Sequence, residues 1–395
     1  MCLNLPVRPV AALRFAVLAL AACEPPRDLR CESGDLCPVI STENQIAGVA
    51  LDGTPALEAE MYAPIDLGFD PSGSLVALDW NNHRILRLDE SGNIEGITGR
   101  AGELGDGPEG PVIDAKWNHP TDVVWRDDGS MLVAAWHNGR VNEVSAEGEL
   151  TFLFGIGGRR FDGDGGLASE AAFDLPASVD LDENGMVYIA DQGSMRVRAV
   201  GLDGVIQTIV GTGEHGYSGD GGPATSATLS ANRSSEAAPS SKLAYHEGAL
   251  YLADTENSRI RTVDVASGLI ETIAGRGEVA VTAFREAPAP CSSGCGYSGD
   301  GGPAVEAELS SPVDVEVAPD GTIYIADTDN HCVRRIDTDG VIDTVIGVCS
   351  EPGNDGDFGS ATLAHLFLPF GIALDPDGVL YVADSYNHRI RRLEP

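Results

Sequence analysis

Short runs of alternating apolar and polar residues follow one another along almost the whole chain, and turn sequences separate them. Around Val313, for example, the runs VDVEVAP, IYIAD, CVRRID and VIDTVIG are separated by the turns PDG and TDG and by a polar stretch. Period-two alternation, β-branched residues and Asp-Gly turns are typical of antiparallel strands. The pattern therefore predicts units of four short strands and no helix longer than a turn or two.

This four-strand pattern occurs six times. Its clearest marker is the stretch GTIYIADTDNHCVRRID from Gly321, and its aspartate position is filled in the six copies by Asp79, Ala135, Asp191, Asp254, Asp327 and Asp384. Successive copies are separated by 56, 56, 63, 73 and 57 residues. Four-stranded sheets repeated in a ring are the β-propeller architecture, so six units predict six blades.

The two ends of the chain indicate how the ring closes. The sixth copy stops after its third strand, at Pro395, and the N-terminal part offers one unpaired strand, which we place at Ile40 to Gly48. Pairing that strand with the last blade completes the ring and removes the open edge. The sequence thus predicts an all-β, six-bladed β-propeller of four-stranded antiparallel blades over residues 40–395, closed by an N-terminal strand that pairs with the last blade.

The glycine-rich sequence GYSGDGGPA occurs at Gly216 and again at Gly296, and degenerate copies bring the total to six. A phosphate-binding loop needs one such turn before a helix, usually with a lysine, and this chain repeats the turn in every unit with neither. We therefore interpret it as a structural turn with positive-φ glycines and a capping aspartate. The alternative is a calcium site at Asp162 and Asp164, which are spaced like oxygen ligands; no other cofactor is expected.

The repeated Asp-x-x-Asn-His-Arg stretch, which holds His83, His331 and His388, is interpreted in the same way. One copy per unit is what a turn-stabilising hydrogen-bond network requires. An enzyme would instead gather one polar residue from each of several blades around the central channel. A metal-dependent propeller lyase or hydrolase, with its site at the channel mouth, is therefore the alternative function.

The unit DPDGVLYVADSYNHRIRRL from Asp375, the pentapeptide ETIAG at Glu271 and the GYSGDGGPA loops together resemble the NHL repeat. The loops are most similar to those of NHL propellers in teneurin-type and bacterial secreted proteins. The resemblance covers roughly residues 40–395 and implies the propeller fold. It implies no particular function, because one fold carries many different sites.

The N-terminus predicts export. Arg8 and Arg14 precede or adjoin an apolar run from Phe15 to Ala22, and the sequence Leu-Ala-Ala-Cys that ends at Cys23 resembles a bacterial lipobox. We expect a lipoprotein signal peptide over residues 1–22, lipid attachment at Cys23 and a tether over residues 23–39. The protein is then anchored by lipid alone in the bacterial cell envelope, on the periplasmic side or the cell surface. A plain secretory signal is the alternative and would give a secreted protein.

Six cysteines remain beyond Cys2 and Cys23, and an even number in an exported chain favours disulfides over metal ligation. Cys332 begins the third strand of its unit and Cys349 follows the fourth, so both lie at the same end of one blade. We predict a bond between them. Bonds between Cys31 and Cys37 and between Cys291 and Cys295 follow by elimination.

The formal net charge of −36 limits the kinds of partner that the protein is expected to bind. So acidic a chain repels nucleic acid and anionic membrane surfaces, and the charge keeps an exported protein soluble. Nucleic-acid binding is therefore excluded, and a monomer is expected.

Departures from the repeat indicate where a ligand would bind. In each unit, the turn between the second and third strands and the long connection to the next unit share one face, here called the loop face. Trp80 and Trp136 fill a slot of that turn that elsewhere holds small polar residues, and His137 has no counterpart. Exposed tryptophans suit a sugar or a peptide, although packing under a neighbouring loop is equally consistent with the pattern. The insertion at residues 276–296 is a second candidate.

These observations favour a non-catalytic scaffold that binds a protein or glycan ligand through its loop face, at Trp80, Trp136 and His137.

Overall fold

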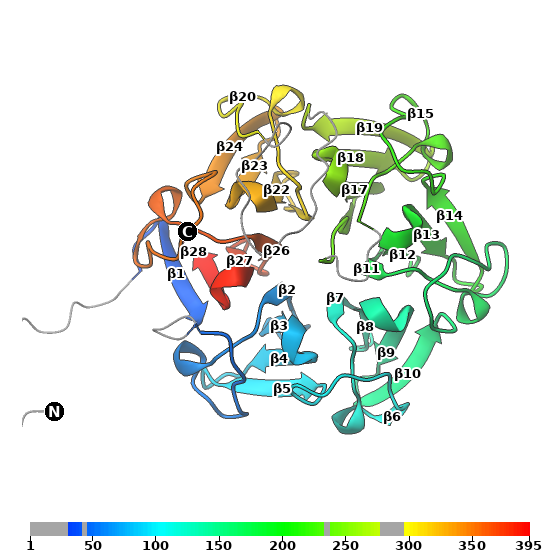
Figure 1. The fold of residues 1–395 in the computed structure, drawn as a ribbon, viewed down its shortest axis with the longest axis horizontal. Helices are drawn as coiled ribbons and strands as arrows, with labels where there is room; N and C mark the ends of the chain where they lie inside the picture. Colours follow the sequence, from blue (N-terminus) through cyan, green and yellow to red (C-terminus); the bar gives the residue numbers. More distant parts are fainter. Residues whose placement is uncertain (1–30, 42–45, 233–237, 277–295) are drawn as a thin grey trace, which may run out of the picture. The chain divides into compact units, whose positions relative to one another are not determined.

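The computed structural model describes residues 31–41, 46–232, 238–276 and 296–395. Residues Cys31–Pro395 form one compact unit, in which six antiparallel sheets are arranged in a ring (Figure 1). The six-bladed propeller is therefore confirmed. The predicted signal sequence, Cys23, the predicted Cys291–Cys295 bond and almost all of the insertion at 276–296 lie outside the described residues.

In each blade the first strand lies nearest the centre of the ring and the fourth lies outermost (Figure 1). Blade 1 contains β2 (Pro64–Phe69), β3 (Leu75–Asp79), β4 (Arg84–Leu88) and β5 (Ile94–Thr98). Blade 2 contains β7 (Pro120–Trp125), β8 (Met131–Ala135), β9 (Arg140–Val144) and β10 (Glu149–Phe154). Blade 3 contains β11 (Pro176–Leu181), β12 (Val187–Asp191), β13 (Arg196–Val200) and β14 (Ile206–Val210). Blade 4 contains β16 (Leu243–His246), β17 (Ala249–Asp254), β18 (Arg259–Asp264) and β19 (Leu269–Ala274). Blade 5 contains β21 (Asp314–Val317), β22 (Ile323–Asp327), β23 (Cys332–Ile336) and β24 (Val341–Ile346). Blade 6 contains β26 (Pro369–Leu374), β27 (Leu380–Asp384), β28 (Arg389–Leu393) and β1 (Asp35–Ile40).

The long connections between blades run along the outer edge of the ring. In four of them a two-residue strand pairs with the outermost strand of the next blade; these strands are β6 (Gly110–Pro111), β15 (Gly222–Pro223), β20 (Gly302–Pro303) and β25 (Gly359–Ser360). Each connection also has a 3₁₀ turn, namely η1 (Ala56–Glu58), η3 (Val112–Asp114), η5 (Ala168–Glu170), η7 (Ala224–Ser226), η9 (Ala304–Glu306) and η11 (Ala361–Leu363). Covering an outer strand in this way protects it from pairing with another chain.

A second set of 3₁₀ turns joins the second and third strands of the blades. These turns are η2 (Trp80–Asn82), η4 (Trp136–Asn138), η6 (Gln192–Ser194), η8 (Thr255–Asn257), η10 (Thr328–Asn330) and η12 (Ser385–Asn387). Each ends at a residue in the left-handed conformation, such as His331 with φ of 58°. They lie on the loop face. The turns between the first and second strands and between the third and fourth strands lie on the opposite face, here called the turn face.

The ring closes by the predicted pairing, but the closing strand lies earlier in the chain. β1 pairs with β28, with Leu36 opposite Leu393 and Ile40 opposite Ile390. The expected position at Ile40 to Gly48 is wrong, and the propeller begins at Asp35, inside the segment assigned to the tether. Pro38 lies at a register shift in the β1–β28 ladder, where a residue without an N–H is tolerated. Because a proline usually ends a strand, Pro38 makes β1 difficult to recognise from the sequence.

Apolar side chains fill the spaces between neighbouring blades. One cluster joins Leu132 and Val141 of blade 2 to Val179 and Ile189 of blade 3, and other clusters join the following pairs of blades. Trp117, which the repeat places in the core, is fully buried in the cluster at blades 1 and 2, and Trp125 packs against it. Burial of these sheet faces is the main stabilising contribution to the ring.

Two of the three predicted disulfides are present in the described residues. Cys332 and Cys349 are bonded, with Cα atoms 5.1 Å apart, and Cys31 is bonded to Cys37. Within the described ranges, no helix has the length and apolar character needed to cross a membrane.

Candidate functional site

On the loop face of blade 6, one buried carboxylate connects the turn between the second and third strands with the long connection that enters the blade. Asp384 accepts a hydrogen bond of 2.8 Å from the backbone N–H of Phe367. It also accepts a charge-assisted hydrogen bond of 2.9 Å from Nε of Arg389. Asn387 donates to Asp384 at 2.9 Å and to the carbonyl of Gly353 at 2.7 Å. The turn and the connection are thereby held as one layer.

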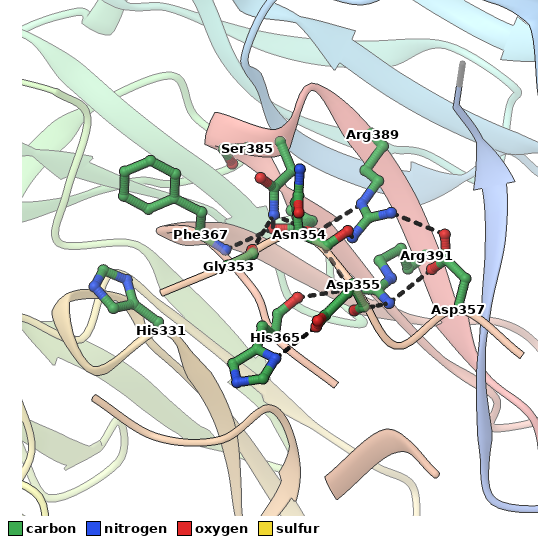
Figure 2. Close-up of polar contacts among 12 residues, drawn as sticks. His331, Gly353, Asn354, Asp355, Asp357, His365, Phe367, Ser385, Arg389 and Arg391 are labelled. Atoms are coloured by element: carbon green, nitrogen blue, oxygen red, sulfur yellow. Dashed lines mark hydrogen bonds and ion pairs between the residues drawn. The ribbon is translucent and has the colours of Figure 1, made fainter. Parts of the chain in front are cut away.

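The aspartate of the glycine-rich connection belongs to the same network. Arg389 and Arg391 contact the two carboxylate oxygens of Asp357 at 2.9 and 2.7 Å (Figure 2). The corresponding pairs in blades 3, 4 and 5 are Asp164–Arg198, Asp220–Arg261 and Asp300–Arg334, at 2.7, 2.6 and 2.6 Å, with every arginine fully buried. Both sequence motifs are therefore halves of one structural network, as their repetition predicts.

The two residues proposed for calcium have other partners. Asp164 is paired with Arg198 and also accepts a hydrogen bond from the backbone of Thr208, and Asp162 caps the N–H of Gly163 at 2.8 Å. Within the described ranges, no group of three or more His, Cys, Asp or Glu side chains is arranged to hold a metal ion. Calcium binding here stays a prediction, and an ion would have to share Asp164 with Arg198.

Blade 2 lacks this network, because Ala135 occupies the aspartate position and Asn142 the arginine position. Asn138 replaces the missing carboxylate: its Oδ1 accepts the backbone N–H of Asn118 at 3.0 Å, and its Nδ2 donates to the carbonyl of Gly105 at 3.0 Å. The bond to Gly105 is the one that the turn asparagine makes in blade 6, whereas the bond from Asn118 replaces the one that the buried aspartate accepts there.

The two tryptophans on this part of the loop face do not form an exposed pair, so the expectation of exposed side chains is wrong. Trp136 is 0% exposed, packs with Leu175 and Ala177 and donates from Nε1 to Gln192 at 3.3 Å. Trp80 is partly buried, and the two rings lie 6.0 Å apart. His137 is partly buried and stacks on Trp136.

The reason is that the tryptophan slot faces the next blade in the whole repeat. The small polar residues that fill it in the other blades are themselves at most 2% exposed: Gln192, Thr255, Thr328 and Ser385. Their polarity suggests a surface position, but each hydroxyl or amide is satisfied by the protein, as when Thr328 donates to the carbonyl of Pro369 at 2.7 Å. Polar residues at this position of the repeat therefore indicate buried hydrogen bonds and do not indicate an exposed side chain.

A cavity of about 430 Å³ lies on the axis of the ring between the first strands of the blades. We call it the axial pocket. Its polar side chains come from five blades: Asp66, Asp122, Asp180, Lys242, Asp314 and Glu316. Phe69, Trp125 and Tyr245, at the turn-face end of their strands, are partly exposed and line its outer part.

Lys242 crosses the axis of this pocket. Its Nζ lies 2.5 Å from Oδ1 of Asp66, on the opposite side of the ring, and 3.3 Å from Oδ2 of Asp314. Burial favours the neutral amine, but the two carboxylates outweigh it and raise the pKa of Lys242 above its usual value. Gly371 leaves the necessary space, because a Cβ there would lie 2.7 Å from Cα of Asp66.

The axial pocket opens toward the turn face and is closed toward the loop face. Ile65, Val313 and Phe370, which directly precede Asp66, Asp314 and Gly371, are at most 2% exposed, and Ala238 belongs to the same apolar cluster. In the opposite direction the strand residues become partly exposed. A ligand therefore has access to the carboxylates from the turn face.

Some of the pocket carboxylates also link neighbouring blades. Asp122 accepts the backbone N–H of Val179 at 2.9 Å, and Asp180 accepts that of Tyr245 at 2.6 Å. Burial is the largest influence on Asp180 and raises its pKa to about 7. These groups are fixed in place by the scaffold.

Glu316 differs from them. No hydrogen bond to its carboxyl group is found among the described residues, and burial, followed by the nearby Asp314 and Asp180, raises its pKa well above the usual range. Glu316 is therefore the pocket carboxyl most available to a ligand.

Sequence reasoning did not identify the axial pocket. Its signal is an acidic residue among the apolar residues of a first strand, such as Asp66 in β2 or Asp314 and Glu316 in β21. In a strand buried on both faces, such a residue needs a polar interior to face.

Comparisons with known proteins agree with the repeat. Residues 247–352 match the family model described as Teneurin NHL domain, and residues 368–393 match the NHL repeat. Teneurin-1 of Homo sapiens is 29% identical over 392 residues, which cover 90% of this chain and 13% of teneurin-1. The chain thus spans about an eighth of the length of the teneurins that it matches.

Two solved structures from Bacteroides thetaiotaomicron share the fold. A structural genomics protein of unknown function has a TM-score of 0.62 at 18% identity and covers 91% of this chain and 75% of its own. An auxiliary nutrient binding protein has a TM-score of 0.59 at 15% identity and covers 90% of this chain and 75% of its own.

Proposed function

Starting from the premise that the chain is a propeller of NHL repeats, we propose that it is a non-catalytic binding protein that receives part of a glycan or protein ligand in its axial pocket. The observation that carries the proposal is the cavity of about 430 Å³ with carboxyl groups from four blades and partly exposed aromatic rings. This replaces the loop face as the binding surface, because Trp136 is buried there and Trp80 is partly buried.

The composition of the pocket favours a polar, hydroxylated or cationic group. Carboxylates accept hydrogen bonds from hydroxyl and ammonium groups. Phe69, Trp125 and Tyr245, whose rings pack against the clusters between blades, add some apolar surface beside them. A terminal sugar meets both requirements. The solved structure described as an auxiliary nutrient binding protein, which has the same fold, is consistent with a ligand-binding role.

We place the protein in the bacterial cell envelope, held by a lipid on Cys23. The proposal rests on the Leu-Ala-Ala-Cys sequence and on two disulfides, which persist in oxidising compartments. Mass spectrometry of the mature N-terminus tests it directly. An unmodified N-terminus at another residue would contradict the anchor without affecting the pocket.

The second candidate is a hydrolase or lyase at the axial pocket. Asp180 and Glu316 favour it, because carboxyl groups with raised pKa are suited to act as general acids. The described residues provide no metal-binding group of three His, Cys, Asp or Glu side chains, so this candidate would act through the carboxyl groups.

A glycan array with two matched variants tests the binding function. Gly68→Phe places a ring in the axial pocket, where a Cβ meets only the Trp125 ring at 3.4 Å. Leu202→Phe adds the same ring to an exposed third-to-fourth-strand turn on the same face. We expect wild type and Leu202→Phe to bind alike and Gly68→Phe to bind at least tenfold more weakly. Equal binding by all three would refute the pocket, and a shortened glycan in mass spectra would favour the hydrolase.

A further inference from the structure

The loop face at the junction of blades 1 and 2 contains a group of side chains that the repeat does not require. We call His83, Asn118, His119 and His137 the histidine cluster. His119 and His137 replace residues of other types at the corresponding positions in the other blades. The ring of His119 lies 4.3 Å from that of His83 and 4.9 Å from that of His137, measured between centroids. Three imidazoles from two blades therefore meet at one point.

Three potential ligand atoms in the histidine cluster lie at the corners of a small triangle. Nδ1 of His119 is 2.8 Å from Oδ1 of Asn118 and 3.1 Å from Nδ1 of His137, and the third side, from His137 to Asn118, is 3.3 Å. Two ligand atoms about 2.1 Å from one ion, at angles of 90 to 110°, are separated by about 3.0 to 3.4 Å. The sides of 3.1 and 3.3 Å fall within this range and the side of 2.8 Å is slightly shorter, so the triangle is close in size to one face of a metal coordination shell.

Two polar atoms beside the triangle are buried without a partner among the described residues, Nδ1 of His83 and Nε1 of Trp80. His83 is only 9% exposed. The equivalent histidines in blades 5 and 6 are satisfied, because Nδ1 of His331 accepts the N–H of Leu368 and Nδ1 of His388 accepts that of Ala63. Buried polar groups are rarely left unpaired, so the exception at this junction points to a polar species that joins the cluster.

The local chemistry suits a transition metal. Neutral imidazole is the form that binds zinc, nickel and copper. The position that carries a buried aspartate in five blades is Ala135 in blade 2, so no carboxylate from that position competes for the imidazole protons.

We propose that Nδ1 of His119, Nδ1 of His137 and Oδ1 of Asn118 bind one divalent transition-metal ion, with solvent completing its coordination. Water on the ion supplies the hydrogen-bond partners for His83 and Trp80. The third protein ligand is a carboxamide, which agrees with the finding that no three His, Cys, Asp or Glu side chains in the described residues surround a common ion position. Affinity follows the order Zn²⁺ or Ni²⁺ below Cu²⁺. This site is independent of the proposed function, because it lies on the loop face, away from the opening of the axial pocket.

Equilibrium dialysis of the tag-free protein against Zn²⁺, with elemental analysis, tests the site. We expect one ion per chain in wild type and at least tenfold weaker binding in His137→Gln and in His119→Asn, since asparagine tolerates the left-handed φ of 61° at position 119. The matched control is His365→Gln, which removes a histidine paired with Asp355 on the loop face of blade 6. It should bind Zn²⁺ like wild type.

Cu²⁺ provides a second readout. Electron paramagnetic resonance should show two nitrogen ligands in wild type and one in His137→Gln. Circular dichroism confirms folding, and if His119→Asn does not fold, His137→Gln decides alone. Absence of Zn²⁺ binding by wild type at 100 µM, or binding that is lost in His365→Gln and kept in His137→Gln, overturns the proposal.

Discussion

Blades 2 and 5 solve the same structural problem in different ways. In blade 5 the turn between the second and third strands is held by ions: Asp327 is 0% exposed, accepts the N–H of Ser310 at 2.7 Å and lies 3.4 Å from Arg334. In blade 2 the same turn is held by a neutral carboxamide, Asn138, and by the buried ring of Trp136. The fold thus requires the connection between turn and loop, but it does not require a fully buried ion pair, since the Arg140–Asp106 pair of blade 2 is partly exposed.

This difference between the blades indicates where the fold tolerates other residues at the turn positions. Blades 3 to 6 each bury an arginine that is paired with carboxylates, so exchanging a single member of this network weakens the pairing of a buried charge. Blade 2 has no such constraint, and this is the blade where His119 and His137 appear. The histidine cluster thus lies at the junction of a blade that has the buried aspartate–arginine pair, blade 1, with the blade that lacks it.

The largest effect should come from removing the apolar support of blade 2. Trp136→Ala leaves a cavity against Leu175 and Ala177 and should lower the free energy of unfolding by about 4 kcal/mol. Thr255→Ala in the same slot of blade 4 should cost about 1 kcal/mol. Urea denaturation measures both. Equal and small losses would mean that Trp136 is not a structural substitute for the network.

The next effect concerns the ionic support of blade 5. Asp327→Ala should destabilise the protein by about 3 kcal/mol, because Arg334 keeps only Asp300 and the N–H of Ser310 loses its acceptor. The double variant Asp327→Ala, Arg334→Asn copies the residues of blade 2 and should recover part of the loss. A double variant less stable than the single one would show that blade 2 depends on more than these two positions.

A smaller effect is expected from pH. Burial raises the pKa of Asp191 in blade 3 to about 7, although Ser194 and Arg198 lower it, and its Oδ2 has no partner among the described residues. The folded state therefore holds this proton between about pH 4 and 7 while the unfolded chain releases it, so its contribution to stability falls as the pH rises through that window.

Asp191→Asn removes this titration. Relative to wild type, the variant should gain about 1 to 2 kcal/mol between pH 5 and pH 8. Asp203→Asn, in an exposed turn of the same blade, is the control. If the free energies of unfolding of wild type and Asp191→Asn change in the same way with pH, the raised pKa of Asp191 is contradicted.

The fold could be predicted from the sequence because its signals repeat. Alternation, turns and the spacing of the copies give six blades, and the positions of Cys332 and Cys349 give their bond. The closing strand was misplaced because Pro38 resembles a strand end and is tolerated only at an irregularity that depends on β28.

The candidate site was much less predictable, because it depends on which residues share a blade or an axis. Trp136 occupies a slot that looks exposed only because its other occupants are polar. The carboxyl groups of the axial pocket are far apart in sequence, and Asp66 and Lys242 meet only when the ring is complete. The histidine cluster likewise combines residues from two blades whose positions carry no shared spacing.

The pairing of β1 with β28 has a consequence for the order of folding. Ile40 is among the first residues of the propeller to be synthesised and its partner Ile390 among the last. Five blades can form as each is completed, but the sixth needs strands from both ends, which gives this protein a very long-range contact as its final step. Until the last residues emerge, the edges of β1 and of the last blade are unpaired and able to associate with another chain.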